Sequence, residues 1–319
     1  MIFSKQIGGM YRKMLFSRVD ADGLVKYFSC EDFPGLSRES YTFKGAQGQT
    51  LQGWFYSYER SIPGRILVFV HGFGGGHTAY MTEIERLADH GFTVFAYDNT
   101  GCMESGGNGN GFAQAVSDLD ACLKALKADP RLEGMRYSVV GHSWGAYATM
   151  NIAALHPDIT HLVAMCGPIS AQQLIRQNFS GPLSLYRKDI YKLEEAANPA
   201  YAPLSAEDSL RHTGAHTLLI YSADDRSVRK DLHYDLLRDG LTGCRNIRFL
   251  LVNGKDHNPN YTADAVSYLG EFQAALAELR KQKKIEPQVR HAFINKWDWK
   301  RMTAQDDKIW QEIFDTLDM

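Results

Sequence analysis

The stretch YSVVGHSWG covers residues 137–145 and joins a short apolar run to a Gly-x-Ser-x-Gly motif. Tyr137–Val140 is typical of a buried strand, and residues 146–155 predict the helix that follows. A serine on so sharp a strand-to-helix turn adopts a strained backbone, and the flanking glycines let neighbouring chain come close. We therefore expect the Ser143 hydroxyl to stand above the carboxyl edge of a sheet, with the amide of residue 144 pointing into the same space.

The alternation of strand and helix continues on both sides of this motif. Further strands are predicted at residues 66–70, 92–97, 161–165, 217–221 and 247–252. Helices are predicted at residues 78–90, 229–239 and 263–283, and one more has Ala115, Leu119, Cys122, Leu123 and Leu126 on a single face. Residues 40–44 and 51–58 flank a Gly-Ala-Gln-Gly turn and predict an antiparallel hairpin. The pattern predicts an α/β fold: a mostly parallel eight-stranded sheet with helices on both faces.

Three segments fall outside this alternation. Residues 167–212 contain four prolines and no clean period, and an irregular loop of that length is unusual in a compact domain. We therefore predict a small, partly helical lid insertion there. Residues 1–38 form an N-terminal extension, and residues 287–319 form a helical C-terminal appendage in which Ile309, Ile313 and Leu317 are spaced by four. Both are expected to pack on the core, which covers about residues 40–283, or on a partner subunit.

Composition limits the function classes. The chain has 319 residues with a formal net charge of −2, which argues against a dedicated nucleic-acid binder. Its five cysteines are scattered and include no Cys-x-x-Cys pair, so neither a disulfide framework nor a zinc knuckle is predicted. Residues 1–16 lack the apolar core of a secretory signal, and no run is long enough to span a membrane. We expect a cytoplasmic protein with no membrane span.

Two further loops carry residues suited to catalysis. The strand at 217–221 leads into Ser222-Ala223-Asp224-Asp225, and the strand at 247–252 leads into a loop containing His257. A neutral serine hydroxyl is a poor nucleophile and needs a base, and a carboxylate can fix the tautomer of that base. Either Asp224 or Asp225 could supply the carboxylate, and Asp224 could instead cap a turn or helix.

These landmarks resemble the α/β-hydrolase superfamily over about residues 40–283. The resemblance implies a catalytic triad of Ser143, Asp225 and His257 in that chain order. It favours Asp225 because the family pattern of Asp, two residues, then Val matches Asp225 and Val228. The family also carries His-Gly after its third strand, followed by a residue whose N–H completes an oxyanion hole. Here that motif is His71-Gly72-Phe73, so the implied oxyanion donors are the backbone N–H groups of Phe73 and Trp144.

The other histidines and the glycine-rich and basic stretches have structural interpretations. His71, His77 and His142 are near the motifs, but the resemblance makes His71 and His142 structural, and His77 precedes a helix. The glycines of residues 106–111 lack the dinucleotide-binding spacing, and the chain has neither a Gly-x-x-x-x-Gly-Lys loop nor a His-Glu-x-x-His site. The basic residues at 280–284 complement a helix carboxyl end. No cofactor and no metal is predicted.

The implied function is a serine hydrolase that cleaves a carboxylic ester through an acyl-enzyme. The alternative is a peptidase or amidase of the same fold that acts on short peptides, and a non-catalytic binding protein is a third hypothesis. The expected partner is a small ester or short peptide, with a homo-oligomer left open. In the lid, Leu174, Phe179, Leu183, Tyr186 and Tyr191 either line an acyl pocket or seal the lid onto the core.

Overall fold

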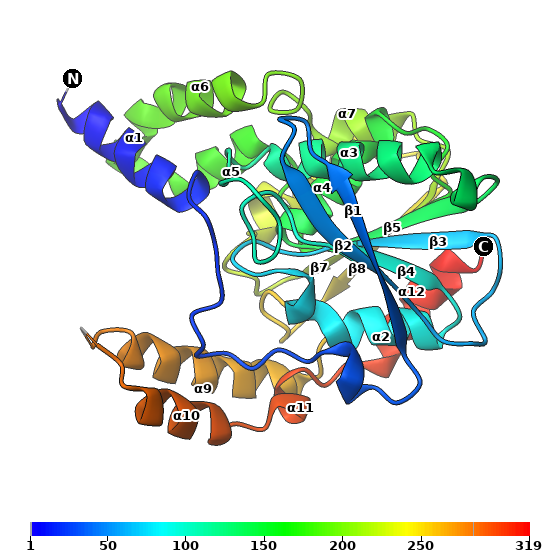
Figure 1. The fold of residues 1–319 in the computed structure, drawn as a ribbon. Helices are drawn as coiled ribbons and strands as arrows, with labels where there is room; N and C mark the ends of the chain where they lie inside the picture. The colour runs from blue at the N-terminus through cyan, green and yellow to red at the C-terminus, as the bar shows by residue number, and fades with distance from the viewer. Residues whose placement is uncertain (1, 283) are drawn as a thin grey trace.

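A single eight-stranded sheet organises the molecule (Figure 1). The computed structural model describes residues 2–282 and 284–319. In spatial order the strands are β1 (Ser37–Lys44), β2 (Thr50–Ser57), β4 (Thr93–Tyr97), β3 (Arg65–Val70), β5 (Arg136–His142), β6 (His161–Met165), β7 (His216–Ser222) and β8 (Ile247–Val252). Strand β2 is antiparallel to β1 and β4, and all later neighbours are parallel. The predicted mostly parallel sheet with an N-terminal hairpin is confirmed.

Helices cover both faces of this sheet (Figure 1). On one face lie α3 (Gln114–Ala128), α4 (Trp144–Asn151) and α8 (Tyr234–Gly240). On the other face lie α2 (Met81–Asp89), α9 (Ala263–Leu279) and α12 (Asp307–Leu317). Two predicted boundaries were wrong. Residues 230–232 form a 3₁₀ turn, so α8 starts at Tyr234 rather than near Arg229, and α9 stops at Leu279. The predicted end at Lys283 lies outside the described residues.

The continuous apolar run at residues 66–70 follows from burial on both faces. Val68 and Val70 belong to the core on the α3/α4 face, whereas Leu67 and Phe69 belong to the core under α2 and α12. Successive side chains of a strand point to opposite faces, so a strand covered on both sides needs an apolar residue at every position. This arrangement places the ends of β3, β5, β7 and β8 at one edge of the sheet, where the functional loops meet.

The segment between β6 and β7 is largely helical. It contains α5 (Ala171–Asn178), a 3₁₀ helix (Gly181–Tyr186), α6 (Arg187–Ala197) and α7 (Ala206–Arg211). Serine side chains begin two of these helices: Ser170 accepts a hydrogen bond from the N–H of Gln173, and Ser205 accepts one from Asp208. Such caps satisfy backbone donors that the first turn of a helix leaves free.

The two terminal segments pack on the core. Helix α1 (Ile2–Leu15) buries Tyr11 and Leu15 on the α3/α4 face, while residues 24–36 join the opposite layer. The first strand starts at Ser37, two residues inside the predicted extension. At the other terminus, α10 (Pro287–Asn295) and α11 (Trp299–Met302) lie beside α9, and α12 is buried against the sheet (Figure 1). Within the described residues, every helix is too short or too polar to cross a membrane.

Candidate active site

Ser143 occupies the turn between β5 and α4 in a strained conformation. Its backbone has φ 55° and ψ −113°, a region that non-glycine residues enter at a cost on the order of 1–3 kcal/mol. The flanking glycines make the turn possible. A Cβ on Gly145 would lie 1.9 Å from the carbonyl oxygen of Val70, and one on Gly141 would lie 2.5 Å from backbone atoms of residue 145. The Gly-x-Ser-x-Gly spacing is thus required by the close approach of β3, β5 and α4.

His257 connects Ser143 to a carboxylate. Its Nε2 lies 2.8 Å from Ser143 Oγ, and its Nδ1 lies 2.7 Å from Asp225 Oδ2. The other oxygen of Asp225 accepts the N–H groups of Ser227 and Val228 at 2.7 and 2.9 Å. A carboxylate anchored in this way can only accept from Nδ1–H, so Nε2 is left unprotonated toward the serine hydroxyl. The structure thus brings together Ser143, Asp225 and His257.

Asp224 has no hydrogen bond to His257 in the described structure and instead organises the loop that carries this histidine. Its carboxylate accepts the Ser222 hydroxyl and the N–H groups of Gly254 and Asp256, at 2.8 to 3.1 Å. Burial by itself would raise the pKa of Asp224, but these hydrogen bonds outweigh it and lower that pKa below its usual value. The two adjacent carboxylates therefore have separate structural roles.

Phe73 and Trp144, the two residues expected to donate backbone N–H groups, line the same cavity as Ser143. Trp144 is the first residue of α4, so its N–H has no partner within the helix and lies at the positive end of the helix dipole. Phe73 follows β3, is 43% exposed, and packs edge-on against the Trp144 ring with centroids 5.5 Å apart. Among the hydrogen bonds of the described residues, neither N–H has a protein acceptor. Both are therefore free to donate to a ligand.

The nearby histidines 71 and 77 are fixed by structural hydrogen bonds. His71 is fully buried: its Nε2 accepts the N–H of Asn99 at 2.9 Å, and burial lowers its pKa. His77 bonds to Asp98 at 2.8 Å and to the Tyr56 hydroxyl at 2.9 Å. These rings join the loop after β3 to the loop after β4, and neither reaches Ser143 by a hydrogen bond in the described structure.

His142 holds the loop that carries His257 through a hydrogen bond to its backbone. Its Nε2 lies 2.7 Å from the backbone oxygen of His257, and a carbonyl can only accept, so Nε2 carries the proton. Its Nδ1 then accepts the hydroxyl of Tyr80 at 2.9 Å. Burial lowers the pKa of His142 to about 3, so the ring stays neutral above mildly acidic pH. Sequence reasoning missed this role and that of Tyr80, because nothing in the motif shows which loop His142 contacts.

Replacing His142 should lower turnover without moving its pH dependence. We expect His142→Ala to reduce kcat by up to about tenfold, because a lost hydrogen bond of this kind contributes roughly 0.5–1.5 kcal/mol. His142→Gln should recover part of the loss, since its amide can still donate to the His257 carbonyl. The midpoint of the acid limb of the kcat profile should match wild type, as a ring with a pKa of about 3 does not titrate there. A midpoint displaced by a full pH unit would contradict this role.

The C-terminal segment also holds the histidine loop. Lys255 pairs with Asp306 at 2.6 Å, and Asn260 accepts the N–H of Asp306 through its backbone oxygen at 2.7 Å. The Asn260 side chain donates to Glu83 of α2 and to Gln305 at 3.0 and 2.8 Å. These contacts join residues 255–260 to α2 and to residues 305 and 306, which lie 45 to 51 positions later in the chain. No periodic signal in the sequence predicts them.

A cavity of about 200 Å³ opens beside Ser143. Most of its lining side chains are apolar, and none of those in the described structure is charged. Leu174 of α5 and Phe179, the residue after this helix, line it, as one of the two lid hypotheses expects. The same hypothesis was wrong for three residues. Leu183 and Tyr186 lie outside the cavity wall, and Tyr191 packs on the core beside a different cavity.

One grouping near the site has donor atoms close enough for a metal ion. In the described part of the chain it comprises Cys166, Asp225 and His257, whose ligand atoms lie within 4.8 Å of one another. Two of these residues already share a proton in the 2.7 Å hydrogen bond between His257 and Asp225. Burial raises the pKa of the Cys166 thiol well above its usual value, which keeps it protonated. These three residues therefore fit a hydrogen-bonded His257–Asp225 pair beside a neutral thiol better than they fit a metal centre.

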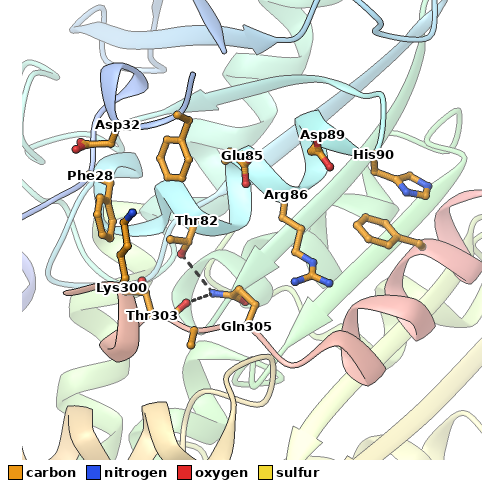
Figure 2. Close-up of a pocket in the computed structure, with 13 residues that line it drawn as sticks. Phe28, Asp32, Thr82, Glu85, Arg86, Asp89, His90, Lys300, Thr303 and Gln305 are labelled. Atoms are coloured by element: carbon orange, nitrogen blue, oxygen red, sulfur yellow. Dashed lines mark hydrogen bonds between the residues drawn. The ribbon is translucent and has the colours of Figure 1, made fainter. Parts of the chain in front are cut away.

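A larger cavity, of about 590 Å³, lies away from Ser143 between α2, residues 28–33 and the C-terminal segment. Figure 2 shows Gln305 between Thr82 and Thr303, with its amide donating to both at 3.3 and 2.9 Å. Acidic and basic side chains alternate around the cavity, and Arg86 is paired with Asp307. None of the described residues that line this cavity is a nucleophile hydrogen-bonded to a histidine. We therefore do not expect this cavity to be the catalytic site, although it is larger than the cavity beside Ser143.

Comparison with known proteins places the chain in a family. A model of the family described as serine aminopeptidase, S33, matches residues 61–295, which is more than half of the chain. A protein of Mycobacterium phage D29 named as a non-heme haloperoxidase is 37% identical over 94 residues, or 30% of this chain and 32% of that protein. Cutinase est1 of Thermobifida alba is 27% identical over 39% of this chain and 42% of its own length. The chain thus spans about a third to two fifths of the length of these curated relatives.

Solved structures show the same fold at low sequence identity. The esterase Pf2001 of Pyrococcus furiosus superposes with a TM-score of 0.60 at 18% identity, covering 83% of this chain and 98% of the esterase. The acylaminoacyl peptidase of Pyrococcus horikoshii superposes with a TM-score of 0.51 at 18% identity, covering 71% of this chain and 39% of the peptidase. Together with the family match, the sheet order confirms the fold that the motifs predicted. The chain belongs to the serine aminopeptidase S33 family of the α/β-hydrolase superfamily.

Proposed function

We propose that the protein is a serine hydrolase that cleaves carboxylic esters with Ser143, His257 and Asp225. The observation that carries the proposal is the unbroken chain of hydrogen bonds from Ser143 Oγ through His257 to Asp225, at 2.8 and 2.7 Å. Nucleophile, base and orienting carboxylate are each within the reach that proton transfer needs. The esterases and the peptidase of similar fold support hydrolysis at a carbonyl centre as the class of reaction.

In the acylation half-reaction, Ser143 Oγ attacks the ester carbonyl carbon while His257 Nε2 takes the hydroxyl proton. The Asp225 carboxylate stabilises the imidazolium that forms. The negative charge that develops on the carbonyl oxygen is stabilised by the N–H groups of Phe73 and Trp144, and one such donor is worth about 3–4 kcal/mol of barrier. The intermediate collapses when the bond to the leaving oxygen breaks and His257 donates its proton to that oxygen. Ser143 is left acylated.

Deacylation repeats these steps with water as the nucleophile. His257 Nε2 takes a proton from the water as its oxygen attacks the acyl carbon, and the same two N–H groups stabilise the second oxyanion. Collapse breaks the bond to Ser143 Oγ, which recovers its proton from His257, and the carboxylic acid leaves. The chain's own residues therefore account for every proton and bond in the cycle.

The second candidate is a peptidase, as the family's name suggests. An aminopeptidase has to bind a charged α-amino group, which needs a nearby carboxylate. The described lining of the cavity beside Ser143 contains no Asp and no Glu. Burying an ammonium group there without a partner would cost several kcal/mol. We therefore favour esters of uncharged acyl groups over free-amino peptides.

Ethyl hexanoate and leucine p-nitroanilide discriminate these candidates. We expect the protein to hydrolyse the ester, which is followed by titration of the released acid, and to leave the anilide intact. The Ser143→Ala variant, measured in parallel, corrects for background hydrolysis. Faster release of p-nitroaniline than of hexanoic acid would replace the esterase proposal with the peptidase.

We also propose that residues 167–212 act as the lid of this site and that the protein works in the cytoplasm. Support for the lid is the contribution of α5 to the cavity wall. Support for a reducing compartment is that all five cysteines are unpaired thiols, four of them buried.

A further inference from the structure

The cavity beside Ser143 has a wall that the lid and the sheet do not provide. Tyr11, Met14 and Leu15 of α1 line it, together with Leu174 of α5 and Phe179, which directly follows α5. Tyr11 and Leu15 are buried, whereas Met14 is 53% exposed although it lines the cavity. Met14 therefore lies at a solvent-exposed edge of the cavity, and the other two residues are buried in its wall. The N-terminal helix is in this way part of the space next to the nucleophile.

Several hydrogen bonds fix α1 in this place. Tyr11 donates its hydroxyl to Glu194 of α6 at 2.6 Å, and the same carboxylate accepts the N–H groups of Phe112 and Ala113 at 2.8 to 3.1 Å. The backbone oxygen of Leu15 accepts the N–H of residue 111 at 3.1 Å. Figure 1 shows α1 next to α6, far in sequence but adjacent in space.

The residues that anchor α1 also contact the turn that carries Ser143. The Trp144 indole donates to the backbone oxygen of Phe112 at 2.6 Å, and Phe112 lies between Glu194 and that indole. The ring of Tyr11 also packs edge-on against Phe179, the residue after α5, with centroids 6.2 Å apart. Helix α1, the lid and the residue after Ser143 therefore form one connected unit, and the position of the α1 wall is set relative to the reacting atoms.

The side of the ester that enters the cavity follows from the position of His257. The leaving oxygen has to lie beside His257 Nε2 to receive its proton. His257 is not part of the cavity lining, whereas Phe73 and Trp144 are. An ester whose carbonyl oxygen meets the N–H groups of these two residues therefore directs its acyl chain into the cavity. The cavity has a volume of about 200 Å³. If each methylene group takes about the 30 Å³ of a water molecule, the cavity holds roughly six or seven carbon atoms.

We propose that this cavity is a binding site for an uncharged aliphatic acyl chain of medium length, and that Met14 on α1 sets the length it accepts. This inference rests on the proposed esterase function and adds the substrate class and a specificity-determining residue. An acyl chain of about six carbons passes between α1 and α5 with Met14 over its far end. A larger side chain at position 14 shortens the site, and a smaller one lengthens it.

Substitutions at positions 14 and 10 test this assignment on p-nitrophenyl acetate, hexanoate and decanoate. We expect Met14→Trp to lower the hexanoate-to-acetate ratio of kcat/KM by about tenfold or more, since one methylene group in an apolar pocket is worth roughly 10–200-fold. Met14→Ala should raise the decanoate-to-hexanoate ratio instead. Met10→Trp is the matched control, because Met10 lies one turn earlier on α1, is 74% exposed and does not line the cavity.

Opposite shifts from the two Met14 variants, with the Met10→Trp ratios within about twofold of wild type, are the expected result. Acetate turnover by each variant shows that the catalytic residues remain in place. Because the Met14 side chain is 53% exposed, we expect both variants to fold. The same ratios in all variants, with acetate still hydrolysed, would overturn the role of α1 and leave the esterase proposal standing. A wild-type protein that hydrolyses none of the esters would overturn the esterase proposal and this inference with it.

Discussion

Replacing Ser143 with alanine should lower kcat for ester hydrolysis by about 10⁴- to 10⁶-fold, the loss typical of removing a triad nucleophile. Without Oγ no acyl-enzyme can form, and the remaining activity comes from substrate binding and the two N–H donors. KM should change little, because the hydroxyl makes few contacts with the ground state. Initial-rate kinetics on p-nitrophenyl hexanoate measure both quantities.

Two companion variants make this result specific. His257→Ala should lose about as much activity as Ser143→Ala, and the double variant should be no slower than either one, because the residues act as a unit. Alanine at position 143 faces the same positive φ as serine, so thermal unfolding should stay close to wild type. Additive losses in the double variant would show that the two residues do not share one proton-transfer step.

Asp225→Asn should lower kcat by about 10³- to 10⁴-fold. The two N–H groups of Ser227 and Val228 hold one side-chain oxygen, so the amide would turn its NH₂ toward His257 Nδ1. Nδ1 would then accept and Nε2 would carry the proton, which is the tautomer that cannot take a proton from Ser143. The loss should lie in kcat, because neither residue binds the substrate in the ground state.

Asp224→Asn is the matched control one residue earlier. It weakens hydrogen bonds that hold residues 254–256 but leaves the contact between Asp225 and His257 in place. We expect a loss of less than about tenfold in kcat and a lower unfolding temperature, in line with one or two weakened hydrogen bonds. If Asp224→Asn proved the more severe variant, the carboxylate would have been assigned to the wrong residue.

Much of the fold could be predicted because local pattern and burial coincide. The apolar run at residues 66–70 identifies a strand buried on both faces, and the strands before Ser143 and Asp225 are buried in the same way. The strand before His257 lies at the edge of the sheet and is mostly half-buried. Parallel strands bring their carboxyl ends to one edge, so the order of three loops was enough to expect three residues side by side. The choice between Asp224 and Asp225 needed the family pattern of Asp, two residues, then Val, because both positions hold the same type of residue.

What the sequence could not supply are contacts made across long distances. Met14 and Phe179 face the same cavity 165 residues apart, and Lys255 pairs with Asp306 across fifty-one residues. Such pairs depend on where whole helices dock, which no local period encodes. The acyl-pocket alternative failed for Leu183, Tyr186 and Tyr191 for the same reason, and Tyr191 packs on the core as the sealing alternative expected. Their apolar character was visible, but the direction in which the lid helices face was not.

The central claim is that Ser143 is a nucleophile activated by His257, and covalent labelling tests it most directly. After reaction with a fluorophosphonate probe, intact-mass analysis of wild-type protein should show one phosphonyl adduct, and peptide mapping should locate it on Ser143. Ser143→Ala should gain no adduct, and His257→Ala should label far more slowly than wild type. An adduct on another residue, or equal labelling of wild type and Ser143→Ala, would contradict the account.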